Sequence, residues 1–144
     1  MVDSAESVEA LIERVAAGER RALAKLLSRV EAGEDLPAPP ESNARPRIVG
    51  ITGSGGAGKS TLVAALVKHL RAAGLKVAVL ASDPQSPLSG GALLGDRVRV
   101  EMDPADEGIY FRSLSTRGAL GGVSAAVEHA LPWLRAFGFD VVLV

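Results

Sequence analysis

The sequence of 144 residues contains no cysteine, which excludes disulfide bonds, thiolate nucleophiles and cysteine metal sites. Aromatic residues make up only 3 %, whereas apolar residues make up 47 %, so aliphatic side chains must fill most of any core. The length allows one ordinary domain, or a smaller domain with an appendage. The lack of cysteine fits a reducing compartment, and we expect a cytoplasmic protein.

The sequence also lacks an excess of charge and a long apolar run. The formal net charge is −1 and there is no basic block, so the charge pattern typical of nucleic-acid-binding proteins is absent. No apolar run approaches the roughly 18 residues that a membrane span needs, and the acidic start has no secretory signal. We therefore expect neither nucleic acid nor a membrane as a partner.

One glycine-rich stretch, residues 53–60 (GSGGAGKS), fits the pattern G-x-x-x-x-G-K-[ST] of phosphate-binding loops. An apolar run over residues 47–52 predicts a strand before it, and residues 61–73 are predicted to form a helix after it. The apolar positions at helical spacing in this helix are Leu62, Ala65, Leu66 and Leu70. The strand–loop–helix context argues against a glycine-rich turn that matches by chance.

The residue types of this stretch suit a nucleoside phosphate. Glycines allow positive φ and a close approach of the backbone, and amides at a helix N-terminus attract a polyphosphate. Lys59 is expected to reach the β and γ phosphates, and the Ser60 hydroxyl to ligate Mg²⁺. The nucleotide-binding residues predicted here are Gly53, Ser54, Gly55, Gly56, Ala57, Gly58, Lys59, Ser60 and Thr61.

Residues 1–33 predict a short helical hairpin, and residues 34–46, which contain four prolines, predict an extended linker. Gly18 separates the two helices, and Asp3 with Glu6 could cap the first. The apolar stripes are Val8, Leu11, Ile12 and Val15 in the first helix, then Ala22, Leu23, Leu26, Leu27 and Val30. Such a hairpin cannot bury both stripes by itself, so it must pack on the following domain or on a partner.

Residues 47–144 predict an α/β domain. Further strands are expected at residues 76–82, 109–114 and 140–144, with a helix near residues 123–137. Alternating strands and helices give a parallel sheet flanked by helices, with right-handed crossovers. Because the sequence stops within an apolar strand, we expect that sheet to be partly uncovered and prone to association, together with the apolar stripes of the hairpin.

Two aspartates are candidates for the site. Ligands bind at the carboxyl ends of parallel strands, which places Asp83, at the end of the second predicted strand, beside the phosphate loop. Asp96 lies on a loop that could fold over the same site, and both carboxylates suit Mg²⁺. A turn-forming role for Asp83 and an ordinary surface charge for Asp96 are the alternatives. Arg97, Arg99, Arg112 and Arg117 could each neutralise transition-state charge, and none is preferred.

Residues 49–61 (VGITGSGGAGKST) resemble the MeaB/ArgK GTPases, which are chaperones of cobalamin-dependent mutases. The other stretches that resemble this family are residues 18–24 (GERRALA), 77–84 (VAVLASDP), 90–97 (GGALLGDR), 111–113 (FRS), 116–122 (TRGALGG) and 136–144 (AFGFDVVLV). The resemblance covers nearly the whole chain apart from the linker.

The resemblance implies a P-loop fold of the SIMIBI class that binds GTP or GDP with Mg²⁺. It also implies GTP hydrolysis that gates cofactor loading and protection of an adenosylcobalamin-dependent acyl-CoA mutase, such as methylmalonyl-CoA mutase. By position, Lys59, Asp83 and Asp96 are the implied catalytic residues, and Ser60, Asp83 and Asp96 the implied metal ligands. Gln85 departs from the family, which usually has serine there, so contacts from that loop are less defined.

The family continues after the last strand with a Glu-Thr-x-Gly switch, an Asn-Lys-x-Asp motif that recognises the base, and a dimerising region. None of these occurs in the 144 residues, so the resemblance implies the N-terminal part of a longer, homodimeric GTPase. We therefore expect weak hydrolysis and little discrimination between GTP and ATP by this chain alone. The alternatives are a transport-linked ATPase or kinase of the ArgK type, and a nucleotide-binding module that does not hydrolyse.

Overall fold

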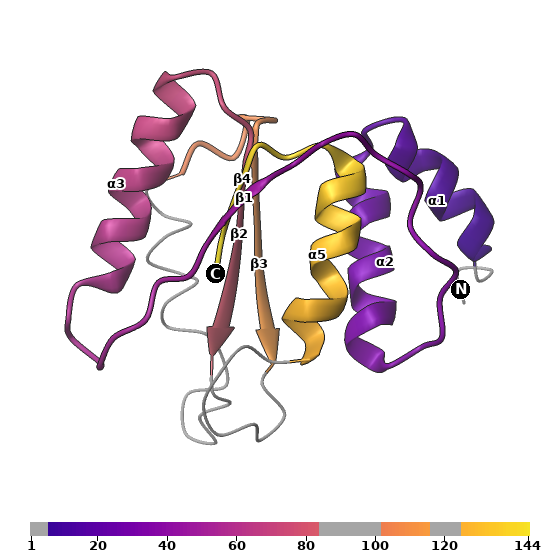
Figure 1. Cartoon of the computed structure of the whole chain (residues 1–144), viewed down its shortest axis with the longest axis horizontal. Coiled ribbons are helices and arrows are strands. Elements are labelled where there is room, and N and C mark those ends of the chain that lie inside the picture. The colour runs from indigo at the N-terminus through magenta and orange to yellow at the C-terminus, as the bar shows by residue number, and fades with distance from the viewer. Residues whose placement is uncertain (1–5, 84–101, 116–124) are drawn as a thin grey trace.

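The computed structural model describes residues 6–83, 102–115 and 125–144 of the chain. Helices flank a parallel sheet on both faces (Figure 1). The elements are α1 (Val8–Ala16), α2 (Arg20–Ala32), β1 (Arg47–Val49), α3 (Lys59–Ala72), β2 (Val77–Asp83), β3 (Ile109–Ser115), α5 (Ala125–Phe137) and β4 (Val141–Leu143). The predicted α/β class is confirmed.

The four strands lie in the order β1-β4-β2-β3, and every neighbouring pair is parallel. In the register of the sheet, Val141 of β4 pairs with Arg47 of β1 on one side and with Val77 of β2 on the other. Val77 in turn pairs with Ile109 of β3. Because all strands run the same way, their carboxyl ends share one edge of the sheet, where ligands of α/β proteins bind.

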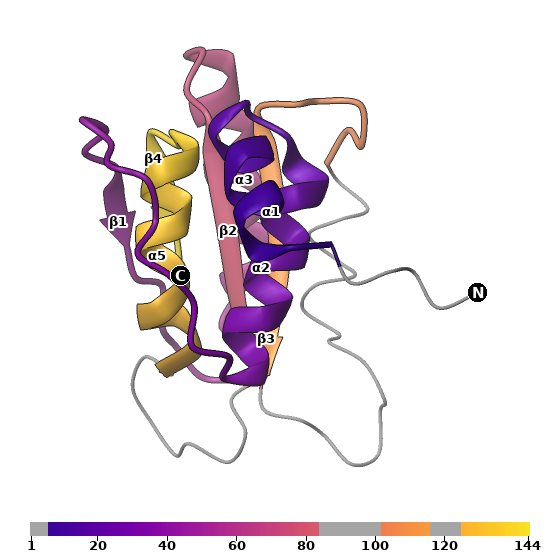
Figure 2. The ribbon, with the colours of Figure 1, turned by 90° about the vertical axis from the view of Figure 1, so that its right-hand side faces the viewer.

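The two faces of the sheet carry separate apolar cores. Helices α1, α2 and α5 lie on one side of the sheet and α3 on the other (Figures 1 and 2). Ala78 and Leu80 of β2 pack in the first core, whereas Val77 and Val79 pack with α3 in the second. Since successive strand residues face opposite sides, burial on both faces explains the near-continuous apolar sequence of β2.

The helical hairpin packs on this domain, which is one of the two possibilities that the sequence left open. Leu11 and Val15 of α1 and Leu23 of α2 are at most 1 % exposed and share a core with Leu134 and Val142. The apolar stripes of the hairpin are thus largely buried against the domain, and the open apolar surface on which the expected association depended is not there.

The expectation of an uncovered sheet is also wrong for β4. Val141, Val142 and Leu143 are all buried. Val142 lies in the core beneath α5, and the other two lie in the core beneath α3. Among the described residues, the exposed large apolar side chain of the sheet is instead Ile48 of β1, at 52 %.

The cap of α1 differs from the prediction. The helix begins at Val8, and the hydroxyl of Ser7 accepts a hydrogen bond from the amide of Ala10 at 3.2 Å. Ser7 therefore satisfies an otherwise unpaired amide of the first turn, and Asp3 lies outside the described residues. Glu6 forms ion pairs with Arg14 and Lys25 instead of a capping box.

The buried side of α3 is rotated from the predicted one. Val63 and Val67 are buried, Leu66 and Leu70 are half-buried, and Leu62 is 51 % exposed. Ala65, another of the apolar positions at helical spacing, is exposed. The helix leaves the phosphate loop at Lys59, so the loop backbone fixes its rotation on the sheet, and the apolar spacing alone did not define that rotation.

The proline-rich residues 34–46 contain neither helix nor strand and pass over α5. Arg135 of α5 donates to the carbonyl of Ala44 at 2.9 Å and to that of Ser42 at 3.2 Å. Leu36 packs against the core that α5 shares with the hairpin. These contacts hold the segment against the helix.

Candidate phosphate-binding site

The glycine-rich loop connects β1 to α3 and has a backbone that favours glycine. The amide of Ala57 donates to the carbonyl of Ser54 at 3.2 Å and closes a turn within the loop. Gly56 has φ +78° and Gly58 has φ +92°, both in the left-handed region. Gly58 is the N-cap of α3, so a residue with a side chain there would strain the start of the helix.

Several amides of the loop are available to a ligand. Within the described part of the chain, the amides of Gly55, Gly56, Gly58, Lys59 and Ser60 donate to no other residue. They lie at the N-terminus of a helix of 14 residues, where the helix dipole favours a negative charge. The loop therefore fits a polyphosphate.

Lys59, the first residue of α3, folds back over the loop. Its Nζ donates to the carbonyl of Gly53 and, at 3.0 Å, to the carbonyl of Ser54. Phosphate oxygens are stronger acceptors than carbonyls because they carry charge. Ser60 follows in the first turn of the helix, and Thr61 is exposed.

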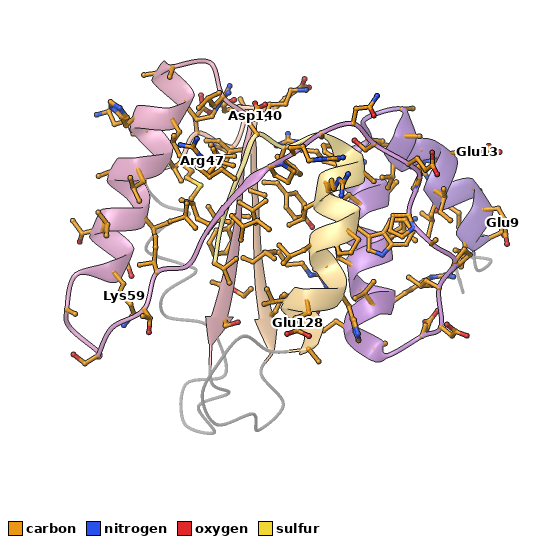
Figure 3. All side chains as sticks on the ribbon, in the orientation of Figure 1. Glu9, Glu13, Arg47, Lys59, Glu128 and Asp140 are labelled. Carbon is orange, nitrogen blue, oxygen red and sulfur yellow. The ribbon has the colours of Figure 1, made fainter. Side chains whose placement is uncertain are left out.

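The loop lies at the carboxyl edge of the sheet. The amide of Ile51 donates to Val144 at 2.7 Å, and the amide of Val144 donates to Val49 at 2.9 Å, so β4 holds the segment leading into the loop. Figure 3 shows Lys59 near the end of the sheet to which the arrows of β2 and β3 point. Lys59 thus projects from the edge that the topology rule assigns to ligands.

The backbone of Asp83 lies at the same edge, because Asp83 is the last residue of β2 and pairs with Ser115 of β3. A cavity of about 110 Å³ is lined by Lys59 and Val63 of α3 and by Ala81 and Ser82 at the end of β2. The structure thus brings the start of α3, with Lys59 and Ser60, to the same part of the sheet as the end of β2.

The remaining candidates named from the sequence either lie outside the described residues or have other contacts. Asp96, together with Gln85, Arg97, Arg99 and Arg117, lies outside the described residues. Arg112 donates to Ser28 and to Glu31 of α2, each at 2.9 Å, and so attaches β3 to the hairpin. His69 and His129 are exposed, and the described residues contain no group of three or more His, Cys, Asp or Glu that could hold a metal.

A polar cluster that no sequence motif marks lies at the opposite edge of the sheet. Arg20 of α2, Arg71 of α3 and Asp106, which precedes β3, are joined by hydrogen bonds. The bonded residues are 35 and 86 positions apart in the sequence, and no local motif marks them. Only the fold brings them together.

No helix in the described parts of the chain combines the length and the apolar character that crossing a bilayer requires.

Comparisons with known proteins place the chain among GTPases. The profile of the family described as "Methylmalonyl Co-A mutase-associated GTPase MeaB" matches residues 11–144. A Pyrococcus horikoshii protein named "Putative GTPase" is 48 % identical over 96 % of this chain and 45 % of its own length. The "Fused isobutyryl-CoA mutase" of Cupriavidus metallidurans is 38 % identical over 99 % of this chain and 14 % of its own length.

A solved structure gives the same fold. FtsY from Mycoplasma mycoides superposes with a TM-score of 0.52 at 20 % identity, over 87 % of this chain and 39 % of that one. At this identity the likeness concerns the fold alone. The chain spans less than half the length of the first curated relative that it matches.

Proposed function

We propose the following function from the fact that this chain belongs to the MeaB family of methylmalonyl-CoA mutase-associated GTPases. The chain carries the phosphate-binding part of a GTPase that acts as a chaperone of an adenosylcobalamin-dependent acyl-CoA mutase. Hydrolysis of GTP gates the loading of the cofactor and protects the mutase. The observation that carries the proposal is the loop of residues 53–60, with its available amides at the carboxyl edge of the sheet.

GTP or GDP with Mg²⁺ is the proposed ligand. Residues 53–61 hold the phosphates through their amides, and the ammonium of Lys59 moves from the carbonyls of Gly53 and Ser54 to the β and γ phosphates. Ser60, Asp83 and Asp96 are the proposed oxygen ligands of Mg²⁺, directly or through water. When bound, the metal neutralises charge that develops on the phosphates.

The proposed partner is a mutase of the methylmalonyl-CoA mutase type. Two proteins named "Fused isobutyryl-CoA mutase" contain a segment similar to 99 % and to 92 % of this chain. That segment makes up 14 % of each protein, so each polypeptide contains it alongside a much longer sequence. The fusion supports a physical association with such a mutase, and we propose that this association takes place in the cytoplasm. We also propose that the full-length protein is a homodimer.

Replacing Asp83 or Asp96 by asparagine is expected to weaken Mg²⁺-dependent GTP binding about tenfold, because asparagine removes the charge that a hard cation prefers. Calorimetric titration with and without Mg²⁺ measures this. Asp35→Asn, at an exposed position on the segment that crosses α5, is the matched control and should leave the affinity unchanged. A variant that is less stable but keeps a normal Mg²⁺ dependence of GTP binding would assign the residue to turn formation instead.

The chain is expected to bind an adenosylcobalamin-dependent mutase more tightly with a GTP analogue than with GDP, by about tenfold, since a coupling of that size is ordinary for two linked sites. Surface plasmon resonance on methylmalonyl-CoA and isobutyryl-CoA mutases measures both affinities, with a metal-free dehydrogenase as the control surface. Equal affinity of the chain for the mutase with the two nucleotides would contradict the gating. If the chain binds neither mutase, mutases of this type are excluded as its partner. Tighter binding of ATP than GTP would favour the ATPase alternative.

A further inference from the structure

The turn that precedes β3 lies at the amino-terminal edge of the sheet, opposite the phosphate loop. Asp106 of this turn accepts two hydrogen bonds from Arg71, from Nε to Oδ2 at 2.8 Å and from Nη2 to Oδ1 at 2.7 Å. The amide of Gly108 also donates to Oδ1, at 2.9 Å. Arg71 lies in the last turn of α3 and donates in addition to the carbonyl of Leu75 at 2.7 Å. The turn is thus fixed to the end of α3.

The same turn is fixed to the hairpin on the other face. Arg20, the first residue of α2, donates through Nη1 to the carbonyl of Asp106 at 3.2 Å and to that of Ile109 at 2.9 Å. Figure 1 shows the segment before β3, in orange, above the sheet between α3 and the hairpin. The turn therefore touches both helical layers, which the sheet otherwise separates.

The ion pair between Arg71 and Asp106 is partly shielded from solvent and well aligned. Both side chains are about one-quarter exposed, at 25 % and 24 %, and the pair has the bidentate geometry that favours charge-assisted bonds. The bonds from Arg71, then the one from Gly108, lower the pKa of Asp106, and Asp106 raises the pKa of Arg71. Both groups are therefore charged at neutral pH.

Gly108 makes room for this contact. A Cβ at position 108 would lie 2.1 Å from Cζ of Arg71, so the guanidinium occupies the space of a side chain. Gly108 has no positive φ, so its backbone would accept alanine. Alanine at this position would therefore displace the guanidinium, which is the far end of a flexible side chain.

Helix α3 joins the phosphate loop to this turn. Lys59 and Ser60 begin the helix, and Arg71 lies in its last turn. Between these ends, Val63 and Val67 are buried, and Leu66 and Leu70 pack half-buried against the same core. A helix is stiff along its axis because every turn is hydrogen-bonded to the next. A shift of the loop end therefore moves Arg71.

We propose that the turn of residues 103–108 couples the phosphate loop to the helical hairpin. A ligand that displaces α3 also displaces Arg71 at the end of this helix. Asp106, which is hydrogen-bonded to Arg71, moves with it. Because the carbonyl of Asp106 accepts from Arg20, the displacement extends to α2. The conformation of the hairpin, on the face of the sheet opposite α3, then depends on the ligand bound at the phosphate loop. This coupling rests on the proposed nucleotide binding and extends it to a second surface of the molecule.

Hydrogen–deuterium exchange on the chain, alone and with GDP·Mg²⁺ or a non-hydrolysable GTP analogue·Mg²⁺, tests the coupling. We expect the analogue to change exchange in both α3 and α2 by about threefold or more, as a linked local opening would. Arg20→Met should abolish the response in α2, retain the response in α3, and leave the nucleotide affinity within about twofold. Gly108→Ala, which displaces Arg71, should also abolish the response in α2.

Arg14→Met is the matched control, because Arg14 forms ion pairs with Glu6 and Glu19 inside the hairpin and does not reach the turn. This variant should keep the response of α2. An α2 response that persists in both Arg20→Met and Gly108→Ala, or a nucleotide-bound wild type without any α2 response, would overturn the coupling alone. A wild type that binds no nucleotide in calorimetry would overturn the proposed function, and the coupling with it.

Discussion

Replacing Lys59 by alanine is expected to weaken the binding of GTP·Mg²⁺ by about 100-fold or more, which corresponds to about 2.7 kcal/mol. Lys59 supplies the charged donor of the described loop, and a hydrogen bond to a charged group contributes about 1.5–3 kcal/mol. In the free chain, the same ammonium donates to carbonyls of Gly53 and Ser54, which are neutral and weaker acceptors. Isothermal titration calorimetry measures the loss directly.

Lys68→Ala is the matched control, because Lys68 lies on the same helix and is exposed. It should bind GTP·Mg²⁺ like the wild type. Lys59→Arg separates charge from shape, since arginine keeps the charge but is a planar fork and not a point donor. We expect arginine to recover only part of the affinity. Wild-type affinity in Lys59→Ala would rule out the assignment of the phosphate loop.

Replacing Leu23 by alanine is expected to lower the free energy of unfolding by about 3–5 kcal/mol. Leu23 of α2 is fully buried, in a core that also contains Leu134 of α5 and Val142 of β4. A cavity there would affect the hairpin, α5 and the sheet together. Urea denaturation followed by circular dichroism measures the loss, and a single transition is expected because the hairpin and the sheet share one core.

Leu62→Ala on α3 is the matched control for the same chemical change in a helix. Leu62 is 51 % exposed, so its truncation should alter stability by less than about 0.5 kcal/mol. A loss in Leu62→Ala as large as in Leu23→Ala would show that the buried side of α3 is the one that the apolar spacing predicted. Two separate transitions in Leu23→Ala would show that the hairpin unfolds independently of the sheet.

Features encoded within a short stretch of sequence could be predicted. The near-continuous apolar run of β2 and the glycine pattern of residues 53–60 are local, and the structure has a strand and a loop at these positions. The order of elements then sufficed for a parallel sheet, because crossover connections are right-handed and their strands run one way. The position of Asp83 at the carboxyl edge followed from that topology.

Features that depend on distant parts of the chain could not be predicted. The rotation of α3, which buries Val63 and exposes Leu62, depends on how the loop leaves the sheet. The pairing of Asp106 with Arg71 depends on the packing of α3 beside β3, and neither residue lies in a recognisable motif. The burial of β4 was missed because α5 and α3 cover it, although they precede it in the chain.

The strand order affects when each strand can pair during translation. β1 emerges from the ribosome first, but its partner in the described sheet is β4, which is made after every other strand of that sheet. β2 and β3 are closer in sequence and can pair while β4 is still untranslated. Because closing a longer loop costs more chain entropy, β1 is expected to join the sheet last. The strand that supports the phosphate loop is therefore expected to pair only after β4 has left the exit tunnel, and the proposed nucleotide affinity would arise no earlier.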